Sequence, residues 1–183
     1  MKAQATSIVK LRDMAKETRA MLGLSQDQPV SMAKIYDFAS LRIDGFEYEV
    51  KDNDDPCFQY GDEAFYDINL KKIVVKEYVF KEACNHPSSR SQYTLAHEFG
   101  HSIPSNVFHL KLCRENKKEK IPPYEDPEWQ ADTFAAEFLM PFDECIKISP
   151  EEISLRFGVS KECSEVRKEK VMKKVGKRKV NCK

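Results

Sequence analysis

The sequence lacks long hydrophobic runs. No stretch of its 183 residues approaches the roughly 18 consecutive apolar residues that a membrane-spanning helix needs. The first residues, MKAQATSIVKLRDMAKE, return to charged side chains before a hydrophobic segment of signal-peptide length can form. We therefore expect a cytoplasmic protein with no membrane partner.

Closely spaced cysteine pairs are also missing. The chain has 6 cysteines, spread widely and without a C-x-x-C pair, so nothing indicates a zinc knuckle or a thiol redox motif. Disulfide frameworks are typical of shorter, secreted chains. We expect free thiols in a reducing compartment.

The sequence has no net charge, since 30 Lys and Arg balance 30 Asp and Glu, but the charged residues are unevenly distributed along it. Residues 161–183 contain ten Lys or Arg and three Glu, a net charge of +7, so residues 1–160 carry −7. A basic tail can contact nucleic acid or an acidic partner, but such runs are more often solvated helix faces. Direct nucleic-acid binding is therefore not expected.

Periodicity and chain-breaking residues predict an α+β fold with a small mixed or antiparallel sheet packed on helices. The predicted helices cover residues 4–22, 31–41, a segment from Pro87 that ends at Pro104, and 127–140. The predicted strands cover residues 43–50, 64–68 and 73–78, the last two as a β-hairpin, and 111–123 is expected to be an exposed loop.

One predicted helix carries the motif His97-Glu98-Phe99-Gly100-His101, which has the form H-E-x-x-H. Two histidines one helical turn apart leave the same face and can bind one Zn²⁺. Glu98 lies about 100° around the helix from His97, where it can act as a general base without being a ligand. Zinc lowers the pKa of a bound water, so this pattern indicates hydrolysis of a carbonyl compound.

A catalytic zinc site needs a third protein ligand. His109 is a poor candidate because Pro104 and Val107 occupy the places where the metzincin spacing requires glycine and histidine. Glu128 fits better, because it opens the next predicted helix. Glu125 and Asp126 are alternatives close to it in sequence.

The helix after Glu128 supplies further candidates. Asp132 follows Glu128 by one turn and could accept the second N–H of a liganding histidine. Small side chains at Ala131, Ala135 and Ala136 would let the two helices approach closely. Candidates for stabilising an oxyanion or contacting substrate are Tyr93, Tyr124 and His109, among which the sequence does not choose.

Two segments resemble the ImmA/IrrE family of zinc metallopeptidases. They are Arg90-Ser91-Gln92-Tyr93-Thr94-Leu95-Ala96-His97-Glu98-Phe99-Gly100-His101 and Glu128-Trp129-Gln130-Ala131-Asp132-Thr133-Phe134-Ala135-Ala136-Glu137-Phe138-Leu139-Met140-Pro141. Weaker similarity covers the hairpin and residues 155–160, which resemble a helix-turn-helix-like segment. The chain departs from the pattern at residues 102–106, where many relatives have an apolar run and another histidine.

The resemblance implies one Zn²⁺ per chain held by His97, His101 and Glu128, with Glu98 as general base. It also implies that Asp132 supports a liganding histidine without binding the ion itself. Mn²⁺ or Fe²⁺ would fit the same ligands. It also implies a zincin-like metallopeptidase domain over residues 1–145 and a helix-turn-helix-like segment with a basic tail over 146–183. Family members typically cleave a helix-turn-helix repressor of the XRE type, and we expect such a protein substrate here.

Two other functions remain open from the sequence. The protein could bind and sequester its partner without catalysis, or it could regulate by binding DNA through residues 151–183. We also predict that the hairpin of residues 64–78 supplies an edge strand to which an extended substrate adds. A proline within residues 73–76 would test that arrangement.

Overall fold

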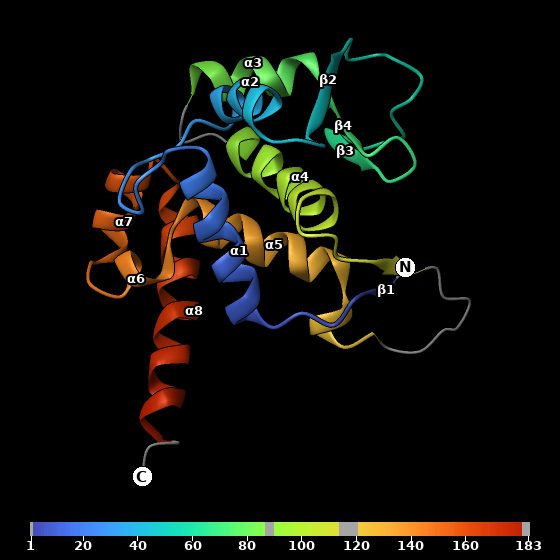
Figure 1. Ribbon diagram of the computed structural model, residues 1–183. Helices are drawn as coiled ribbons and strands as arrows, with labels where there is room; N and C mark the ends of the chain where they lie inside the picture. Colours follow the sequence, from blue (N-terminus) through green and yellow to red (C-terminus); the bar gives the residue numbers. More distant parts are fainter. Residues whose placement is uncertain (1, 87–89, 114–120, 181–183) are drawn as a thin grey trace.

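A computed structural model describes residues 2–86, 90–113 and 121–180 of the chain (Figure 1). Its helices are α1 (Ile8–Met21), α2 (Met32–Arg42), α3 (Glu77–Asn85), α4 (Arg90–Asn106), α5 (Pro127–Leu139), α6 (Phe142–Cys145), α7 (Pro150–Phe157) and α8 (Lys161–Val180), with the 3-10 turn η1 (Pro123–Glu125). Its strands are β1 (Lys2–Ala3), β2 (Glu47–Lys51), β3 (Ala64–Asp67), β4 (Lys72–Lys76) and β5 (Leu112–Cys113). The predicted α+β class is confirmed.

The main sheet is small and mixed, with the strand order β2-β4-β3. Strand β4 is central, parallel to β2 and antiparallel to β3, so the predicted hairpin is present. Because β4 has neighbours on both sides, the edge of the hairpin that no other described strand pairs with belongs to β3. A proline in residues 73–76 would therefore break the sheet itself, and the test of edge binding moves to β3.

Helix α4 is fixed against the sheet side of the molecule by buried polar contacts. The side chain of Gln92 accepts from the backbone N–H of Met32 on α2 (2.7 Å) and donates to the carbonyl of Ala83 on α3 (2.6 Å). The hydroxyl of Tyr36 donates to the carbonyl of Leu95 (2.7 Å). These bonds hold three helices together beside the sheet (Figure 1).

Helices α4 and α5 pack directly on each other, and Gly100 makes this approach possible. A Cβ atom at Gly100 would lie 2.5 Å from the carbonyl oxygen of Ala131, closer than side chains and backbone can come. Ala131 and Ala135 are fully buried, whereas Ala136 is only half-buried. The contact sets the separation between the two helices that carry the candidate site.

The last helix, α8, joins the body of the protein through a buried ion cluster. The carboxylate of Glu137 on α5 accepts two bonds from Arg12 on α1 (3.1 and 3.2 Å) and lies 2.8 Å from the guanidinium of Arg167 on α8. All three side chains are buried. Helices α7 and α8 are joined by a turn at Gly158, whose backbone lies in the left-handed region (φ 65°). The division of the chain after residue 145 remains a prediction.

Several predicted boundaries were wrong. Helix α4 continues past Pro104 to Asn106, because a proline in the last turn removes only one hydrogen bond and the helix then ends within three residues. The strand predicted over 73–78 ends at Lys76, and α3 starts at Glu77, before Pro87. The expected loop of 111–123 contains β5, which pairs with β1, although residues 114–120 lie outside the described chain.

Within the described residues, no helix combines the length and apolarity that crossing a membrane requires.

Candidate metal centre

Three side chains from α4 and α5 direct their ligand atoms to one point. The Nε2 atoms of His97 and His101 are 3.1 Å apart, and a carboxylate oxygen of Glu128 lies 3.2 Å from the first and 3.5 Å from the second. With zinc–ligand bonds of about 2.0–2.2 Å, a tetrahedral ion separates neighbouring ligand atoms by about 3.3–3.6 Å. The three groups therefore fit a metal ion of this size, and among the described residues they form a potential metal-binding group.

The local sequence explains why Glu128 faces the histidines. Asp126 caps α5 by accepting from the backbone N–H of Glu128 (3.0 Å), and Pro127 occupies the first helical position. Glu128 thus lies in the first turn of α5, which the Gly100–Ala131 contact brings against α4. Of the two alternative ligands, Asp126 serves as this cap and Glu125 pairs with Lys2 (2.6 Å).

Asp132 supports His97 from the side away from the cluster. Its carboxylate lies 2.9 Å from Nδ1 of His97, so an Nδ1–H can donate to it while Nε2 points to the shared centre. The hydroxyl of Tyr93 lies 3.4 Å from the same carboxylate oxygen. The two contacts fix the orientation of the His97 ring.

The electrostatics of these ligands favour a cation between them. Burial opposes charge on His97, but the carboxylates of Asp132 and Glu128 outweigh this and raise the pKa of His97 to about 10. Hydrogen bonds to His101 and His97 hold the pKa of Glu128 well below its usual range. Without a metal, a proton on His97 supplies the positive charge that the carboxylates require.

Glu98 lies beside the cluster and not within it. Its side chain is almost fully buried, and this burial raises its pKa, although the two motif histidines and a backbone hydrogen bond from Tyr66 partly oppose the shift. A carboxylate with raised proton affinity beside a metal position is suited to accept a proton from a nucleophile. Tyr66 belongs to β3, so the outer edge of the sheet lies next to this carboxylate.

Of the three candidates for contacting an oxyanion or substrate, His109 and Tyr124 form no hydrogen bond with the metal ligands within the described part of the chain, whereas Tyr93 contacts Asp132. His109 is exposed in the turn after α4, with a left-handed φ of 55°, and it does not belong to the potential metal-binding group. The side chain of Tyr124 is half exposed in η1, and its backbone carbonyl accepts from Thr6 and Gln130. Tyr93 is the oxyanion candidate that contacts a residue of the site. Its pKa is raised by burial and by the charge of Asp132, so its hydroxyl keeps its proton.

One residue with a positioning role was missed from the sequence. The amide of Asn106 donates to the carbonyls of Gly45 and Lys71 (2.9 and 3.1 Å), and its oxygen accepts from the hydroxyl of Tyr66 (2.6 Å). Asn106 therefore fastens the end of α4 to the sheet edge. It lies in residues 102–106, where the chain departs from the family pattern, and that departure was the only signal.

The fold and site together define a class of protein. A helix bearing two histidines one turn apart, a facing helix bearing a glutamate and a small mixed sheet beside them are the arrangement of a metallopeptidase. Residues 78–168, about half of the chain, match the family described as Peptidase_M78, the IrrE N-terminal-like domain, and the chain belongs to this family. The match confirms the resemblance found in the sequence and crosses residue 145. No curated protein and no solved structure matched the chain.

Proposed function

We propose that the protein is a zinc-dependent endopeptidase in which His97, His101 and Glu128 hold the ion. The observation that carries this proposal is the convergence of three ligand atoms, 3.1 to 3.5 Å apart, beside a buried glutamate. An ion held there would act as a Lewis acid on a scissile carbonyl and on water. Zinc is the ion we propose, and Mn²⁺ or Fe²⁺ fits the same ligands.

The residues around the ligands have three proposed roles: proton transfer, orientation of a ligand and stabilisation of the oxyanion. Glu98 accepts the proton of the attacking water and passes it to the leaving amine, which its raised pKa favours. Asp132 holds the His97 ring so that Nε2 faces the ion. Tyr93, one turn before His97, is our preferred donor to the oxyanion because, of the three candidates, its protonated hydroxyl is the one that contacts a residue of the site, Asp132.

The exposed edge of β3 is the proposed binding site for the substrate backbone. In an antiparallel pair, the N–H groups of successive residues point alternately toward and away from the partner. The carbonyl of Glu63 accepts from the backbone N–H of Lys76 on β4, so the backbone groups of Ala64 and Tyr66 point to the opposite edge of β3. There the backbone of Tyr66 hydrogen-bonds Glu98, and Ala64 offers its N–H to a peptide. An extended peptide pairing there would pass beside Glu98.

The proposed substrate is a cytoplasmic repressor of the XRE helix-turn-helix type, and its cleavage would relieve repression. This part of the proposal rests on the family, whose members typically cleave such proteins.

The substrate to be tested is any helix-turn-helix repressor found to be encoded beside this gene. The full chain with one equivalent of Zn²⁺ should cut it at one defined bond and lose this activity in a chelator. Glu98→Gln should keep zinc and repressor binding but lower turnover by about 10²–10⁴-fold. Glu125→Gln, which removes a nearby acid paired with Lys2, is the matched control and should cleave normally. If Glu98→Gln relieved repression as well as the native chain, the protein would be a binding protein instead.

The backbone arrangement has its own test. Ala64→Pro removes an N–H from the free edge of β3 without removing a hydrogen bond to β4, so the sheet should persist. Cleavage should fall at least about tenfold through KM, because main-chain hydrogen bonds supply affinity in such additions. Unchanged cleavage by a folded variant would refute edge binding and leave the metal proposal intact.

A further inference from the structure

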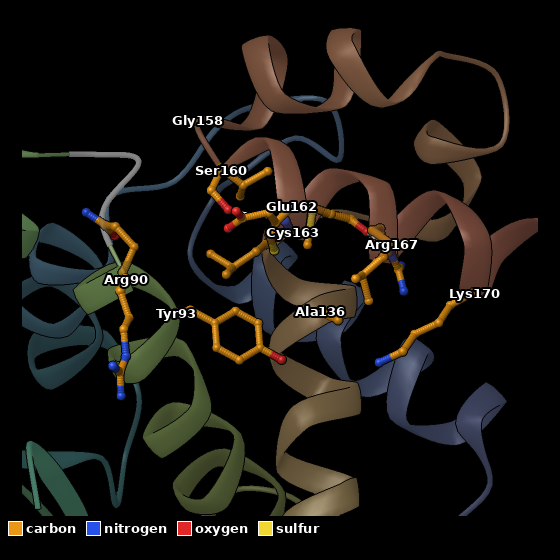
Figure 2. A pocket seen from close by; sticks show the side chains of 14 residues that line it. Arg90, Tyr93, Ala136, Gly158, Ser160, Glu162, Cys163, Arg167 and Lys170 are labelled. Atoms are coloured by element: carbon orange, nitrogen blue, oxygen red, sulfur yellow. Dashed lines mark hydrogen bonds between the residues drawn. The ribbon is translucent and has the colours of Figure 1, made fainter. Parts of the chain in front are cut away.

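A cavity of about 470 Å³ lies where the start of α8 crosses the ends of α4 and α5. Figure 2 shows Tyr93 reaching from α4 toward α5, Ala136 on α5, and Cys163 and Arg167 on α8. Leu139, Met140, Val159 and Val166 add most of the apolar surface, and the polar part of the wall comes from Arg90, Gln92, Ser160, Glu162 and Lys170. A partly open, mainly apolar cavity of this volume falls in the range of ligand-binding clefts, about 300–1,000 Å³.

The cavity is linked to the metal centre by a chain of side-chain contacts. Tyr93, which forms part of its wall, contacts Asp132, and Asp132 contacts His97. On α4, Tyr93, His97 and His101 recur at four-residue spacing, and on α5 the facing residues Glu128, Asp132 and Ala136 do the same. The metal centre and the cavity therefore lie in line along the facing sides of the two helices.

The distance between the metal centre and the cavity suits a peptide substrate. Tyr93 lies about 6 Å along α4 from His97, and Ala136 lies about 12 Å along α5 from Glu128. An extended chain advances about 3.3 Å per residue, so the cavity lies two to four residues from the bond at the metal centre. A side chain of the same bound peptide can enter it.

The rim of the cavity is basic where it turns toward the metal centre. Exposed Lys170 borders this cavity and also a second hollow of about 300 Å³, which is bordered by Asp132, Lys173 and Lys174. These lysines belong to the positive segment noted in the sequence. Lys170 and Arg90 at the cavity outnumber the acid there, Glu162, and this balance favours acidic residues next to the apolar side chain that fills the cavity.

We propose that this cavity is the specificity subsite of the peptidase, which accepts one bulky apolar side chain of the substrate, and that Lys170 selects for an acidic residue beside it. The inference rests on the proposed peptidase function. It gives α8 and its basic face a part in substrate choice.

The first test maps cleavage sites. The zinc-loaded full chain is incubated with peptides from a proteome digest, with Glu98→Gln as the blank, and cut bonds are read by mass spectrometry. We expect Phe, Leu or Met at one position two to four residues from the cut, with Asp or Glu enriched beside it. Lys170→Glu should remove the acidic preference.

Filling the cavity should change the apolar preference. Ala136→Phe adds a ring from the half-buried α5 wall, and Val166→Trp fills the same space from the α8 wall, where Val166 is 50% exposed. Either variant should lower kcat/KM for a peptide with a bulky residue by about 10–100-fold and shift the preference toward Ala. Leu155→Phe, an exposed change on α7, is the matched control and should leave the profile unchanged.

The second test does not depend on cleavage. Cys163 lines the cavity, whereas Cys84 is exposed elsewhere, so the alkylation rates of both thiols can be compared in one sample. Millimolar N-acetylphenylalanine amide should slow alkylation of Cys163 about threefold or more and leave Cys84 unchanged, because an occupied cavity excludes the reagent. N-acetylalanine amide should protect neither thiol.

The two tests separate the two proposals. Cleavage without an apolar preference, or with one that both filling variants leave unchanged, overturns the subsite while the peptidase function stands. Protection of Cys163 without cleavage of any peptide or of the neighbouring repressor overturns the peptidase function and the assignment to substrate. Failure of both tests overturns both proposals.

Discussion

Helix α5 carries two charged clusters on different faces, and they are built differently. Toward α4, Glu128 and Asp132 are exposed and meet histidines that become positive only on binding a proton. Toward α1 and α8, Glu137 is buried between two arginines that are always positive. The first cluster can exchange its proton for a metal ion, whereas the second is complete as it stands.

The difference separates a binding site from a structural connection. A buried carboxylate with permanent partners has no vacancy for a ligand, and breaking it costs stability. A half-exposed cluster of titratable groups costs little to hold open and gains most from an added cation. Charge density alone would not distinguish the two, but exposure and partner type do.

Breaking the buried cluster should have the largest effect on stability. Glu137→Ala leaves Arg12 and Arg167 buried without their carboxylate and should lower the free energy of unfolding by about 3–5 kcal/mol. Urea unfolding would measure it. Asp143→Ala, which removes the exposed partner of Lys16 on the neighbouring α6, is the control and should cost about 1 kcal/mol or less. Equal losses in the two variants would contradict the comparison.

Breaking the exposed cluster should leave stability nearly intact but remove metal. Glu128→Ala takes away one of three protein ligands, and sharing about 10–16 kcal/mol of zinc binding among four ligands gives about 3 kcal/mol. Zinc affinity should therefore fall on the order of 100-fold, as a competition titration with a chromophoric chelator would show. Unchanged affinity would exclude Glu128 as a ligand.

Asp132→Asn should have a smaller effect on the same cluster. It keeps the shape of the side chain but weakens the hydrogen bond to Nδ1 of His97, and changes of this kind cost about 10–100-fold in metal affinity. The same titration measures it. If Asp132→Asn weakened binding more than Glu128→Ala, the roles of the two acids would have to be exchanged.

The smallest effect concerns pH in the zinc-free protein. Since the pKa of His97 is raised to about 10, its stabilising contribution is fully present below about pH 6.5 and is lost as pH rises toward 10. The carboxylates involved are partly exposed, and solvent screens part of this contribution. The difference in urea stability between the native chain and His97→Gln, measured in chelator, should shrink across that range. A difference that stays constant or grows would be inconsistent with this cluster.

The sequence predicted the parts of the site that are local in the chain. His97, Glu98 and His101 lie within one turn and a half of helix, and Glu128 and Asp132 are spaced by one turn, so helical periodicity was enough to group them. The α+β class and the hairpin also followed from local patterns. The alanines of α5 predicted that α4 and α5 pack closely, but the requirement for glycine at Gly100, opposite Ala131, was not predicted.

Long-range partners could not be predicted in this way. The Arg12–Glu137 pair spans 125 residues, and Glu137 sits in a helix whose pattern gives no sign of an arginine from α1. The cavity beneath α8 depends on how the turn at Gly158 directs that helix, which periodicity does not specify. Pro104 was misjudged because its effect depends on how near the helix end it falls.

The contact between Arg167 and Glu137 has a consequence for the order of synthesis. Helices α4 and α5 leave the ribosome first, but Glu137 lacks one of its two arginines until residue 167 has followed. Domains emerging from the ribosome fold as units, and a unit cannot be complete while a buried carboxylate awaits its partner. We therefore expect nascent chains that stop before α8 to resist protease poorly, and the protein to gain activity only when that helix has been made.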